Sequence, residues 1–401
     1  MNVKNPPRLN IGVVGLGRAF TLMLATFTHD SRVRLVGATD PIAAARAQFE
    51  KDFSAPTYDS IEALCSNPDV QLVYIATPHQ FHAEHVCLAL AMGKHVLVEK
   101  PMALSLDECT RMMDAATSAG VHLIVGHSHS FNTPIKRTRE LIDSGAYGAV
   151  KMITALNFTD FLYRPRRPEE LDSAVGGGVI HSQATHQIDI VRLLGGGLVR
   201  SVQAHAGAWD PTRPTEGAYS ALLGFANGAF ASATYNGYGH YDSDALMGNI
   251  GEMGQTKNAQ SYGAARRSLA DAKNSVEEAG LKAAYNYGGS LYFGQQALPS
   301  GSAHQHFGSV IVSCEKADFR PTPLGIEIYR DDQRIFEPLA PPVIPRVEVI
   351  DTLYNAVFDG QPPLHSGAWA RATTEVCLAI LEASRSNSTQ AMRYQVALPD
   401  T

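Results

Sequence analysis

The sequence predicts an α/β protein with an N-terminal parallel sheet and a C-terminal α+β region that contains a largely antiparallel sheet. In residues 8–125 short apolar strands alternate with helices, which requires parallel pairing and right-handed crossovers. Further along, strands are predicted in succession at 199–206, 219–225 and 228–235. A chain of 401 residues is long enough for two cores. We therefore expect domains at 1–125 and 126–345, followed by C-terminal helices at 346–401 that pack back near the first domain.

The composition limits the classes of partner. Hydrophobic residues make up 45% of the chain and charged residues 18%, as in ordinary globular proteins, and the formal charge of −6 gives no reason to expect nucleic acid or an anionic membrane. No apolar run approaches the roughly 18 residues of a membrane span, and the polar N-terminus does not have the pattern of a signal peptide. The five cysteines are scattered without metal-like spacing. We expect a cytoplasmic protein with reduced thiols and no bound metal.

A glycine-rich turn follows the first predicted strand. Residues 9–14 predict a buried strand, Gly15 and Gly17 come directly after it, and residues 19–27 predict a helix. Gly15 permits a tight turn, and Gly17 lets the backbone approach a pyrophosphate on the helix N-terminus. This context is what the dinucleotide-binding fingerprint requires, so we interpret the first domain as a Rossmann domain. The cofactor site should include Gly15, Gly17, Arg18 and Ala19.

Asp40 closes the next predicted strand, residues 32–38, and lies 23 positions after Gly17 (40 − 17). A carboxylate at this place would accept a hydrogen bond from a ribose 2′-hydroxyl and would repel a 2′-phosphate. We therefore expect NAD rather than NADP as the cofactor. Phe20 departs from the pattern because it occupies the position of the third glycine.

Polar side chains also end two later strands. Residues 96–98 predict a buried strand that stops at Glu99, Lys100 and Pro101. Because proline cannot continue a central strand, Lys100 should lie at the carboxyl edge of the sheet, where ligands bind in open α/β sheets. A solvated loop lysine is the equal alternative. The strand at 70–76 ends in further candidates for the cofactor site, unless they serve as loop polarity or helix caps: Thr77, Pro78, His79 and His82.

Histidines and arginines stand out early in the second domain. His127 and His129 follow a strand, and no nearby cysteine or carboxylate completes a metal ligand set. Contact with substrate or cofactor and structural hydrogen bonding remain as their alternatives. Arg164, Arg166 and Arg167 lie in one loop of an acidic protein. Arginine forks suit carboxylates, so this loop is either a clamp for an anionic substrate or a solvated surface loop.

Three glycines at 176–178 precede a helix with two stripes. Ile180, Ala184, Ile188 and Val191 form an apolar stripe at helical spacing, whereas Ser182, His186 and Asp189 form a polar one. The polar stripe is either a solvated face or the wall of a site. Since histidine is the natural general base near neutral pH, His186 is a candidate catalytic residue.

Residues from about 240 to 308 interrupt the second sheet and are rich in glycine, alanine, serine and tyrosine. Within them, the spacing of apolar residues predicts one amphipathic helix from 265 to 279. A lid, a subunit contact and a tolerated insertion are all open interpretations. Strands resume at 309–314 and 325–330, and a proline-rich linker at 341–345 leads to helices at 347–358 and 368–384.

Together these motifs resemble the glucose–fructose oxidoreductase and inositol dehydrogenase family, Gfo/Idh/MocA, over nearly the full chain. The matching elements are Gly12-x-x-Gly15-x-Gly17, Asp40, Thr77-Pro78-x-x-x-His82, Glu99-Lys100-Pro101, and the three glycines that lead to His186 and Asp189. The resemblance implies an NAD-dependent dehydrogenase with a Rossmann domain and an open-faced sheet domain. It also implies a homodimer or homotetramer that forms through the second sheet.

The resemblance further implies that Lys100 and His186 lie beside the nicotinamide as the catalytic residues. Many members carry an acid four residues before the histidine, where this chain has Ser182, and His181 is a candidate substitute. His127 and His129 replace the aromatic and basic residues that are common after the matching glycine. We expect Glu99, Lys100 and His127 at the cofactor, and the substrate site should contain His129, Arg164, His181, Ser182 and His186.

Within the family, the chain resembles the phthalate 4,5-cis-dihydrodiol dehydrogenases of bacterial phthalate degradation. The likeness rests on the insertion, the histidine-rich site positions and the segments 313–315 and 320–323. It implies oxidation of cis-4,5-dihydroxy-4,5-dihydrophthalate to 4,5-dihydroxyphthalate, a small anionic substrate that agrees with the arginine loop. A sugar or polyol dehydrogenase, such as one acting on inositol, is the second interpretation. A non-catalytic NAD-sensing regulator is the third, although the retention of Lys100 and His186 argues against it.

Overall fold

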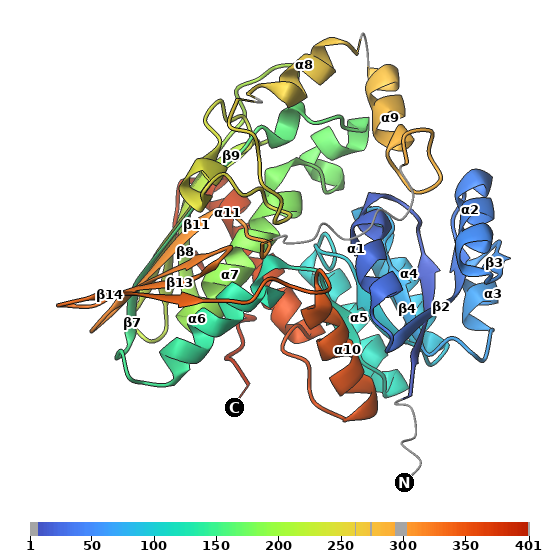
Figure 1. Cartoon of the computed structure of the whole chain (residues 1–401), viewed down its shortest axis with the longest axis horizontal. Coiled ribbons are helices and arrows are strands. Elements are labelled where there is room, and N and C mark those ends of the chain that lie inside the picture. The colour runs from blue at the N-terminus through green and yellow to red at the C-terminus, as the bar shows by residue number, and fades with distance from the viewer. Residues whose placement is uncertain (1–6, 261, 273–274, 293–302, 400–401) are drawn as a thin grey trace. The chain divides into compact units, whose positions relative to one another are not determined.

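A computed structural model describes residues 7–260, 262–272, 275–292 and 303–399, and the chain divides into two compact units (Figure 1). The first unit contains residues 1–127, 281–298 and 344–371. The second contains residues 128–280, 299–343 and 372–401. The insertion at 240–308 therefore contributes residues to both units.

Six parallel strands form the sheet of the first unit, in the order β3-β2-β1-β4-β5-β6. The strands are β1 (Leu9–Val14), β2 (Val33–Thr39), β3 (Thr57–Tyr58), β4 (Leu72–Ile75), β5 (His95–Val98) and β6 (Leu123–Val125). The helices are α1 (Arg18–His29), α2 (Ala43–Phe53), α3 (Ile61–Cys65), α4 (His82–Ala91), α5 (Leu106–Ala119) and α10 (Val347–Phe358). The strand order reverses where β1 pairs with both β2 and β4, which is where ligands bind in doubly wound sheets. The predicted parallel sheet is confirmed.

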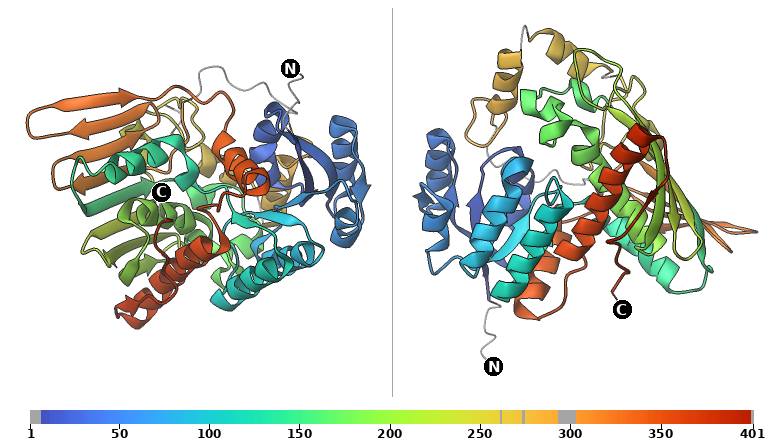
Figure 2. Two further views of the ribbon diagram at one scale, coloured as in Figure 1. Left: turned by 90° about the horizontal axis from the view of Figure 1, so that it is seen from below. Right: turned by 180° about the vertical axis from the view of Figure 1, so that it is seen from behind.

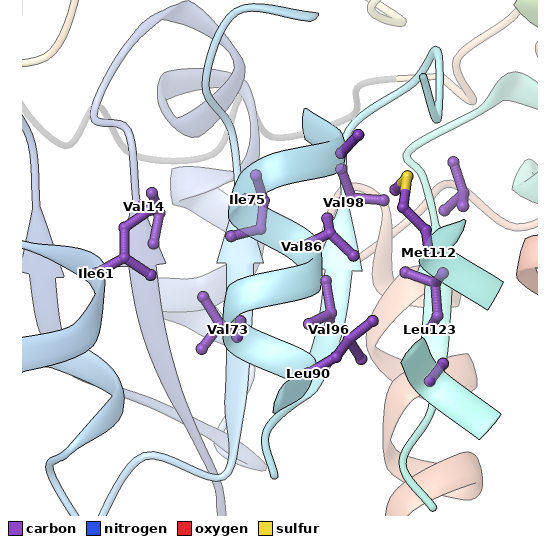
Figure 3. Close-up of a cluster of buried hydrophobic side chains, with 14 of the residues drawn as sticks. Val14, Ile61, Val73, Ile75, Val86, Leu90, Val96, Val98, Met112 and Leu123 are labelled. Carbon is purple, nitrogen blue, oxygen red and sulfur yellow. The ribbon is translucent and has the colours of Figure 1, made fainter. Parts of the chain in front are cut away.

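A continuous apolar core covers one face of this sheet (Figure 3). Val73 and Ile75 of β4 and Val96 and Val98 of β5 meet side chains of α3, α4 and α5, among them Val86. Helices α1 and α2 contribute nothing to this cluster and instead meet each other through a separate pair of phenylalanines. Helices therefore occupy both faces, as the near-continuous apolar strands predict.

The second unit is built on a nine-stranded sheet in the order β14-β13-β12-β11-β7-β10-β9-β8-β15 (Figure 2). Every neighbouring pair is antiparallel except β7 and β10, so the predicted, largely antiparallel sheet is also confirmed. The strands are β7 (Val150–Phe158), β8 (Val199–Gly207), β9 (Ala218–Phe225), β10 (Phe230–Asn236), β11 (Ser309–Cys314), β12 (Asp318–Thr322), β13 (Gly325–Tyr329), β14 (Arg334–Pro338) and β15 (Gln390–Ala391). The remaining helices are α6 (Thr133–Asp143), α7 (Thr185–Gly195), α8 (Ala264–Ala270), α9 (Ser275–Ala284) and α11 (Gly367–Ser386).

Helices α6 and α7 pack on one face of the nine-stranded sheet, through contacts with β7, β10, β12 and β13. Side chains of the central strands alternate accordingly. Tyr235 is buried, whereas Met152 and Phe230, which are paired across β7 and β10, are exposed. The face of the sheet opposite these helices therefore presents apolar side chains.

One expectation about local structure was wrong, and two strands were not predicted. The single helix expected at 265–279 is two helices, because the N–H groups of Asp271 and Ala272 close α8 on the carbonyls of Arg267 and Leu269. Strands β12 and β14 were not anticipated. Pro321 lies within β12, where its register pairs it only with Ile326 of β13, so its missing N–H group interrupts no ladder on the β11 side. No helix among the described residues is long and apolar enough to cross a bilayer.

Candidate active site

The glycine turn of the first unit has the geometry that a dinucleotide needs. Gly15 adopts a φ of +92°, and a Cβ atom there would lie 2.9 Å from the carbonyl group of Ala76, so only glycine fits. A Cβ atom on Gly17 would meet no described atom within 4 Å, so the backbone at the start of α1 is open to close approach. The N-terminus of a helix is where a pyrophosphate binds in this kind of turn. Arg18 and Ala19 are the first residues of this helix.

Asp40 lies beside the turn, directly after β2. Its Oδ2 atom accepts a hydrogen bond from the Leu16 N–H group at 2.7 Å, and its Oδ1 atom accepts one from Ile42 at 2.7 Å. These bonds hold the carboxylate at the carboxyl edge of the sheet, in the place expected for a group that binds a ribose. The residues present therefore fit a dinucleotide.

Phe20 has a packing role that explains its departure from the glycine pattern. The ring is fully buried and packs on Phe49 of α2, with 6.2 Å between centroids. Tyr287 of the insertion meets it edge-on at 5.1 Å, and the Tyr287 hydroxyl group donates to Asp52 at 2.6 Å. A larger side chain at the third glycine position is therefore accommodated by a residue that lies 267 positions later in the sequence (287 − 20).

Glu99 and Lys100 follow β5, as the sequence predicts. Glu99 is buried and accepts a hydrogen bond of 2.6 Å from the Tyr74 hydroxyl group. Burial raises the pKa of Glu99, and the Tyr74 hydrogen bond and the charges of Lys100 and Arg346 oppose that shift. Lys100 is half-buried at the strand end and precedes a cis peptide bond to Pro101.

His82 connects the segments that follow strands β4 and β5. It is fully buried, and its ring nitrogens lie 2.8 Å from the Pro101 carbonyl oxygen and 2.9 Å from that of Thr77. Burial lowers its pKa, and a neutral ring can donate to only one of the two carbonyl groups at a time. His79 lies 5.7 Å from His82 between ring centroids, in the segment that also contains Pro78. His127 is buried directly after β6 and follows a cis peptide bond from Gly126.

The glycine-led helix of the second unit is entirely buried. Every residue of α7 is buried, so the polar stripe with His186 and Asp189 is not a solvated face. A π-helical turn, Ile180–Ala184, precedes α7, a distortion that is frequent at functional sites. Burial lowers the pKa of His181, in this turn, to about 4. The Ser182 hydroxyl group donates to the Gly178 carbonyl oxygen.

Three rings from separate segments form the centre of the second unit's candidate site. His129 and His186 lie edge to face with 4.7 Å between centroids. Phe307 lies 5.3 Å from His129 and 5.0 Å from His186, and it stacks on Tyr235 at 5.9 Å. The structure thus brings together two of the predicted substrate-site histidines and adds Phe307, which the sequence analysis did not identify.

Hydrogen bonds attach the short helical segment that contains His129 to helix α7. Asp189 accepts hydrogen bonds from the Ser130 hydroxyl group and, at 2.9 Å, from Thr373. The buried guanidinium group of Arg192, one turn further along α7, donates to Thr373 at 2.8 Å and to Gln395 at 3.0 Å. Asp189 therefore positions His129 and His186 relative to each other.

The three arginines of the loop have different surroundings. Arg166 lies 3.6 Å over the Phe161 ring and donates to the Phe161 carbonyl oxygen, and Arg167 pairs with Glu169 and Glu170. Arg164 is 46% exposed and reaches Asp160 at 3.3 Å. Burial alone would lower the pKa of Arg164, but the charges of Glu252 and Asp160 raise it. Arg164 is thus the most exposed of the three arginines in this loop.

Glu252 is a further charged residue of the site that sequence analysis missed. It lies in the insertion, 3.3 Å from the Nε2 atom of His129. No local pattern marks a lone glutamate in a glycine-rich segment. The alternation of histidine and other residues at 304–307, directly before β11, is the one signal that could have directed attention to this end of the insertion.

Comparison with known proteins identifies the family. A model of the NAD-binding Rossmann fold of an oxidoreductase family, GFO/IDH/MocA, matches residues 9–127, and a model of the C-terminal domain of that family matches residues 135–255. The chain belongs to the Gfo/Idh/MocA family of oxidoreductases. The predicted family, the NAD(P)-binding Rossmann domain and the prediction of a dehydrogenase are thereby confirmed.

One relative matches this family member almost end to end. Over 379 residues the chain is 49% identical to the 1-carboxy-3-chloro-3,4-dihydroxycyclohexa-1,5-diene dehydrogenase of Comamonas testosteroni, with 94% of this chain and 95% of that protein covered. The crystal structure of a protein from Bordetella bronchiseptica RB50, named as a dehydrogenase, is 38% identical, with a TM-score of 0.90 over 96% of this chain and all of that one. The WlbA dehydrogenase from Bordetella pertussis, crystallised with NADH and UDP-GlcNAcA, shares the fold at 20% identity and a TM-score of 0.67, over 96% and 99% of the two chains.

Proposed function

We propose that the protein is a dihydrodiol dehydrogenase that oxidises the cis-dihydrodiol of an aromatic carboxylate to a catechol, with NAD as hydride acceptor. The observation that carries this proposal is the near-full-length match to a dehydrogenase whose name describes a carboxylated dihydroxycyclohexadiene. The finer proposal is cis-4,5-dihydroxy-4,5-dihydrophthalate as the substrate, within phthalate degradation. The arginine loop supports an anionic substrate of this class.

The proposed reaction removes a proton from one hydroxyl oxygen and a hydride from the carbon that bears it. We assign the proton to His186, assisted by Lys100, and both groups are proposed to act on the same hydroxyl group. When bound, the nicotinamide ring accepts the hydride. The keto product then tautomerises to the catechol, and the gain of aromaticity favours oxidation. General-base assistance of this kind typically contributes about 10²–10⁴-fold.

Arg164 is the proposed partner of the substrate carboxylate. Its guanidinium group is partly exposed, its ion pair with Asp160 is a single contact at 3.3 Å, and it lies close enough to Glu252 for that charge to raise its pKa. Arg166 and Arg167 are occupied by an aromatic ring and by neighbouring acids. One arginine suffices for a monocarboxylate. Comparing kcat/KM for the cis-dihydrodiols of benzoate and phthalate measures how much the second carboxylate of the substrate contributes.

NAD is the proposed cofactor because of Asp40. Its carboxylate is fixed beside the glycine turn by the N–H groups of Leu16 and Ile42, where a 2′-phosphate would meet like charge. The preference is tested by comparing kcat/KM with NAD and NADP. A higher value with NADP would contradict the assignment of Asp40.

The exposed face of the second sheet is the proposed subunit contact. Met152, Leu222, Phe230 and Ile311 are exposed, and the strand registers place all four on that face. Apolar patches of this kind mark interaction sites. Sedimentation of Leu222→Glu and Phe230→Glu variants should show smaller species than the parent protein. An unchanged sedimentation coefficient would place the contact elsewhere.

The experiment that tests the function is a substrate panel followed by NADH absorbance. We expect turnover with cis-dihydrodiols of benzoate and phthalate, and much lower kcat/KM with uncarboxylated dihydrodiols and with myo-inositol. Turnover with inositol alone would establish the polyol interpretation. Absence of turnover with every compound, despite NAD binding, would favour the regulator.

A further inference from the structure

The insertion supplies a carboxylate to the histidine pair of the second unit. The Oε1 atom of Glu252 lies 3.3 Å from Nε2 of His129, and the side chain is 31% exposed. His129 in turn lies edge to face with His186, at 4.7 Å between centroids. A residue at position 252 is therefore linked through one imidazole ring to the proposed base.

One short segment holds both Glu252 and His129 in place. The His306 N–H group donates to the Glu252 carbonyl oxygen at 3.1 Å, and the His306 side chain bonds the Ile250 carbonyl oxygen at 2.8 Å. The Gln305 carbonyl oxygen accepts a hydrogen bond of 2.9 Å from Asn132, which is three residues after His129. Because the segment continues into β11, the glutamate and the histidine are both anchored to the sheet.

Asn132 determines which nitrogen of His129 carries the proton. Its amide nitrogen donates to the Gln305 carbonyl oxygen and lies 2.9 Å from Nδ1 of His129. An amide NH₂ group only donates, so Nδ1 must accept and the proton of a neutral ring must be on Nε2. The opposite orientation of Asn132 would place its oxygen against the Gln305 carbonyl oxygen. The hydrogen-bond network therefore assigns the Nε2–H tautomer, which points its proton at Glu252.

Glu252 is the carboxylate that faces the Nε2–H group of His129, because the other nearby carboxylate is engaged elsewhere. Asp189 of α7 accepts hydrogen bonds from Ser130 and Thr373. Burial alone would raise the pKa of Glu252, but the hydrogen bond from His129 and the charge of Arg164 lower it. The carboxylate therefore stays ionised at neutral pH.

We infer that Glu252 is a positioning residue of the dehydrogenase. It holds His129 in its Nε2–H tautomer against His186, and its negative charge stabilises the imidazolium ion that forms at His186. A carboxylate that orients a histidine and favours its charged form is a recurring catalytic device. The catalytic part of this inference rests on the proposed function. It assigns a role to the insertion, which places a carboxylate against His129, whereas Asp189 of α7 is bonded to Ser130 and Thr373.

The kinetic test compares Glu252→Gln with Asp271→Asn, a control that removes an exposed carboxylate from the same insertion. The glutamine keeps the shape and can still accept from His129, so a purely structural role would survive. With a carboxylated cis-dihydrodiol we expect kcat to fall about 10- to 100-fold, with KM within about threefold of the parent value. The control should be unchanged. A parental kcat in folded Glu252→Gln would overturn the inference.

A second measurement does not depend on the substrate. In NAD-bound protein with isotope-labelled histidine, the pKa of His186 is measured by NMR titration and its signal is assigned with His186→Gln. Among the described residues, Arg164, His306, Asp244 and Asp189 also surround Glu252 and the histidine pair, and they are the same in both proteins. Loss of the negative charge in Glu252→Gln should lower the pKa of His186 by about half a unit or more. An unchanged pKa would also overturn the inference.

The two measurements separate failure of the inference from failure of the proposed function. A parent protein that oxidises no dihydrodiol, but shows the shift in the pKa of His186, would refute the substrate while supporting the coupling of Glu252 to His186. Normal turnover by the parent protein, with no effect of Glu252→Gln on either kcat or the pKa, would refute the inference alone.

Discussion

The two candidate binding regions are built in different ways. In the first unit, main-chain groups form most of the contacts. The start of α1 presents N–H groups, two further N–H groups donate to Asp40, and His82 contacts two carbonyl oxygens. In the second unit, side chains from distant segments meet, as His129, His186 and Phe307 show. The first region should therefore be most sensitive to backbone geometry and the second to side-chain chemistry.

The largest expected effect on stability and cofactor binding concerns backbone geometry at the glycine turn. Gly15→Ala forces a residue with a Cβ atom into a φ of +92° and into contact with the Ala76 carbonyl group. Left-handed strain alone costs about 1–3 kcal/mol. We expect a lower melting temperature and NAD binding weakened at least tenfold, measured by thermal unfolding and by fluorescence titration.

Gly17→Ala is the matched variant for this comparison. Its Cβ atom meets no described atom, so the free energy of unfolding should change by less than about 0.5 kcal/mol while NAD binding still weakens. If Gly15→Ala and Gly17→Ala lowered the free energy of unfolding equally, the positive φ of Gly15 would not be the reason that the turn requires glycine.

The second prediction concerns side-chain chemistry at the arginine loop. Arg164→Met should raise KM for a carboxylated dihydrodiol about 10- to 100-fold, because a hydrogen bond between charged groups contributes about 1.5–3 kcal/mol. Steady-state kinetics with carboxylated and uncarboxylated substrates measure the effect, which should be confined to the former. Arg167→Met, which removes a neighbouring arginine paired with Glu169 and Glu170, is the control. A larger increase in KM for Arg167→Met than for Arg164→Met would show that Arg164 is not the arginine that binds the carboxylate.

The smallest expected effect is at the part of the insertion that packs in the first unit. Tyr287→Phe removes the hydroxyl group that donates to Asp52 and should lower the free energy of unfolding by about 0.5–1.5 kcal/mol, measured by urea denaturation. Tyr292→Phe is the matched control, because the buried hydroxyl group of Tyr292 has no hydrogen-bond partner among the described residues. If Tyr292→Phe destabilised the protein as much, the Asp52 bond would not be what anchors the segment.

The same contrast explains what could be predicted from the sequence. Gly15 and Asp40 follow a strand directly and Lys100 lies two residues after one, so their place at the sheet edge is determined by a few adjacent residues. Phe20 looked like a defect because its partner, Tyr287, lies in a segment without a motif. Glu252 and Phe307 were missed for the same reason, although the histidines at 304 and 306 are a signal close to Phe307. Their positions depend on hydrogen bonds and ring contacts that link segments more than 100 residues apart.

The errors in secondary structure also have local physical causes. Apolar residues at helical spacing continue across 265–279, but spacing does not reveal that the N–H groups of Asp271 and Ala272 turn back to close α8. Pro321 argues against a strand wherever both ladders are needed, and the sequence does not show that only one is used at that position. Burial of the whole of α7 likewise depends on tertiary packing, so its polar stripe could not be distinguished from a solvated face.

The most direct test of the central claim is a double-mutant cycle of Lys100→Ala and His186→Ala, with kcat/KM measured on a carboxylated cis-dihydrodiol. If the two groups act on one hydroxyl proton, each single substitution should lower kcat/KM about 10²–10⁴-fold. The double variant should then lose far less kcat/KM than the product of the two single losses. Near-parental turnover by either folded single variant, or losses that multiply fully, would contradict a shared catalytic site.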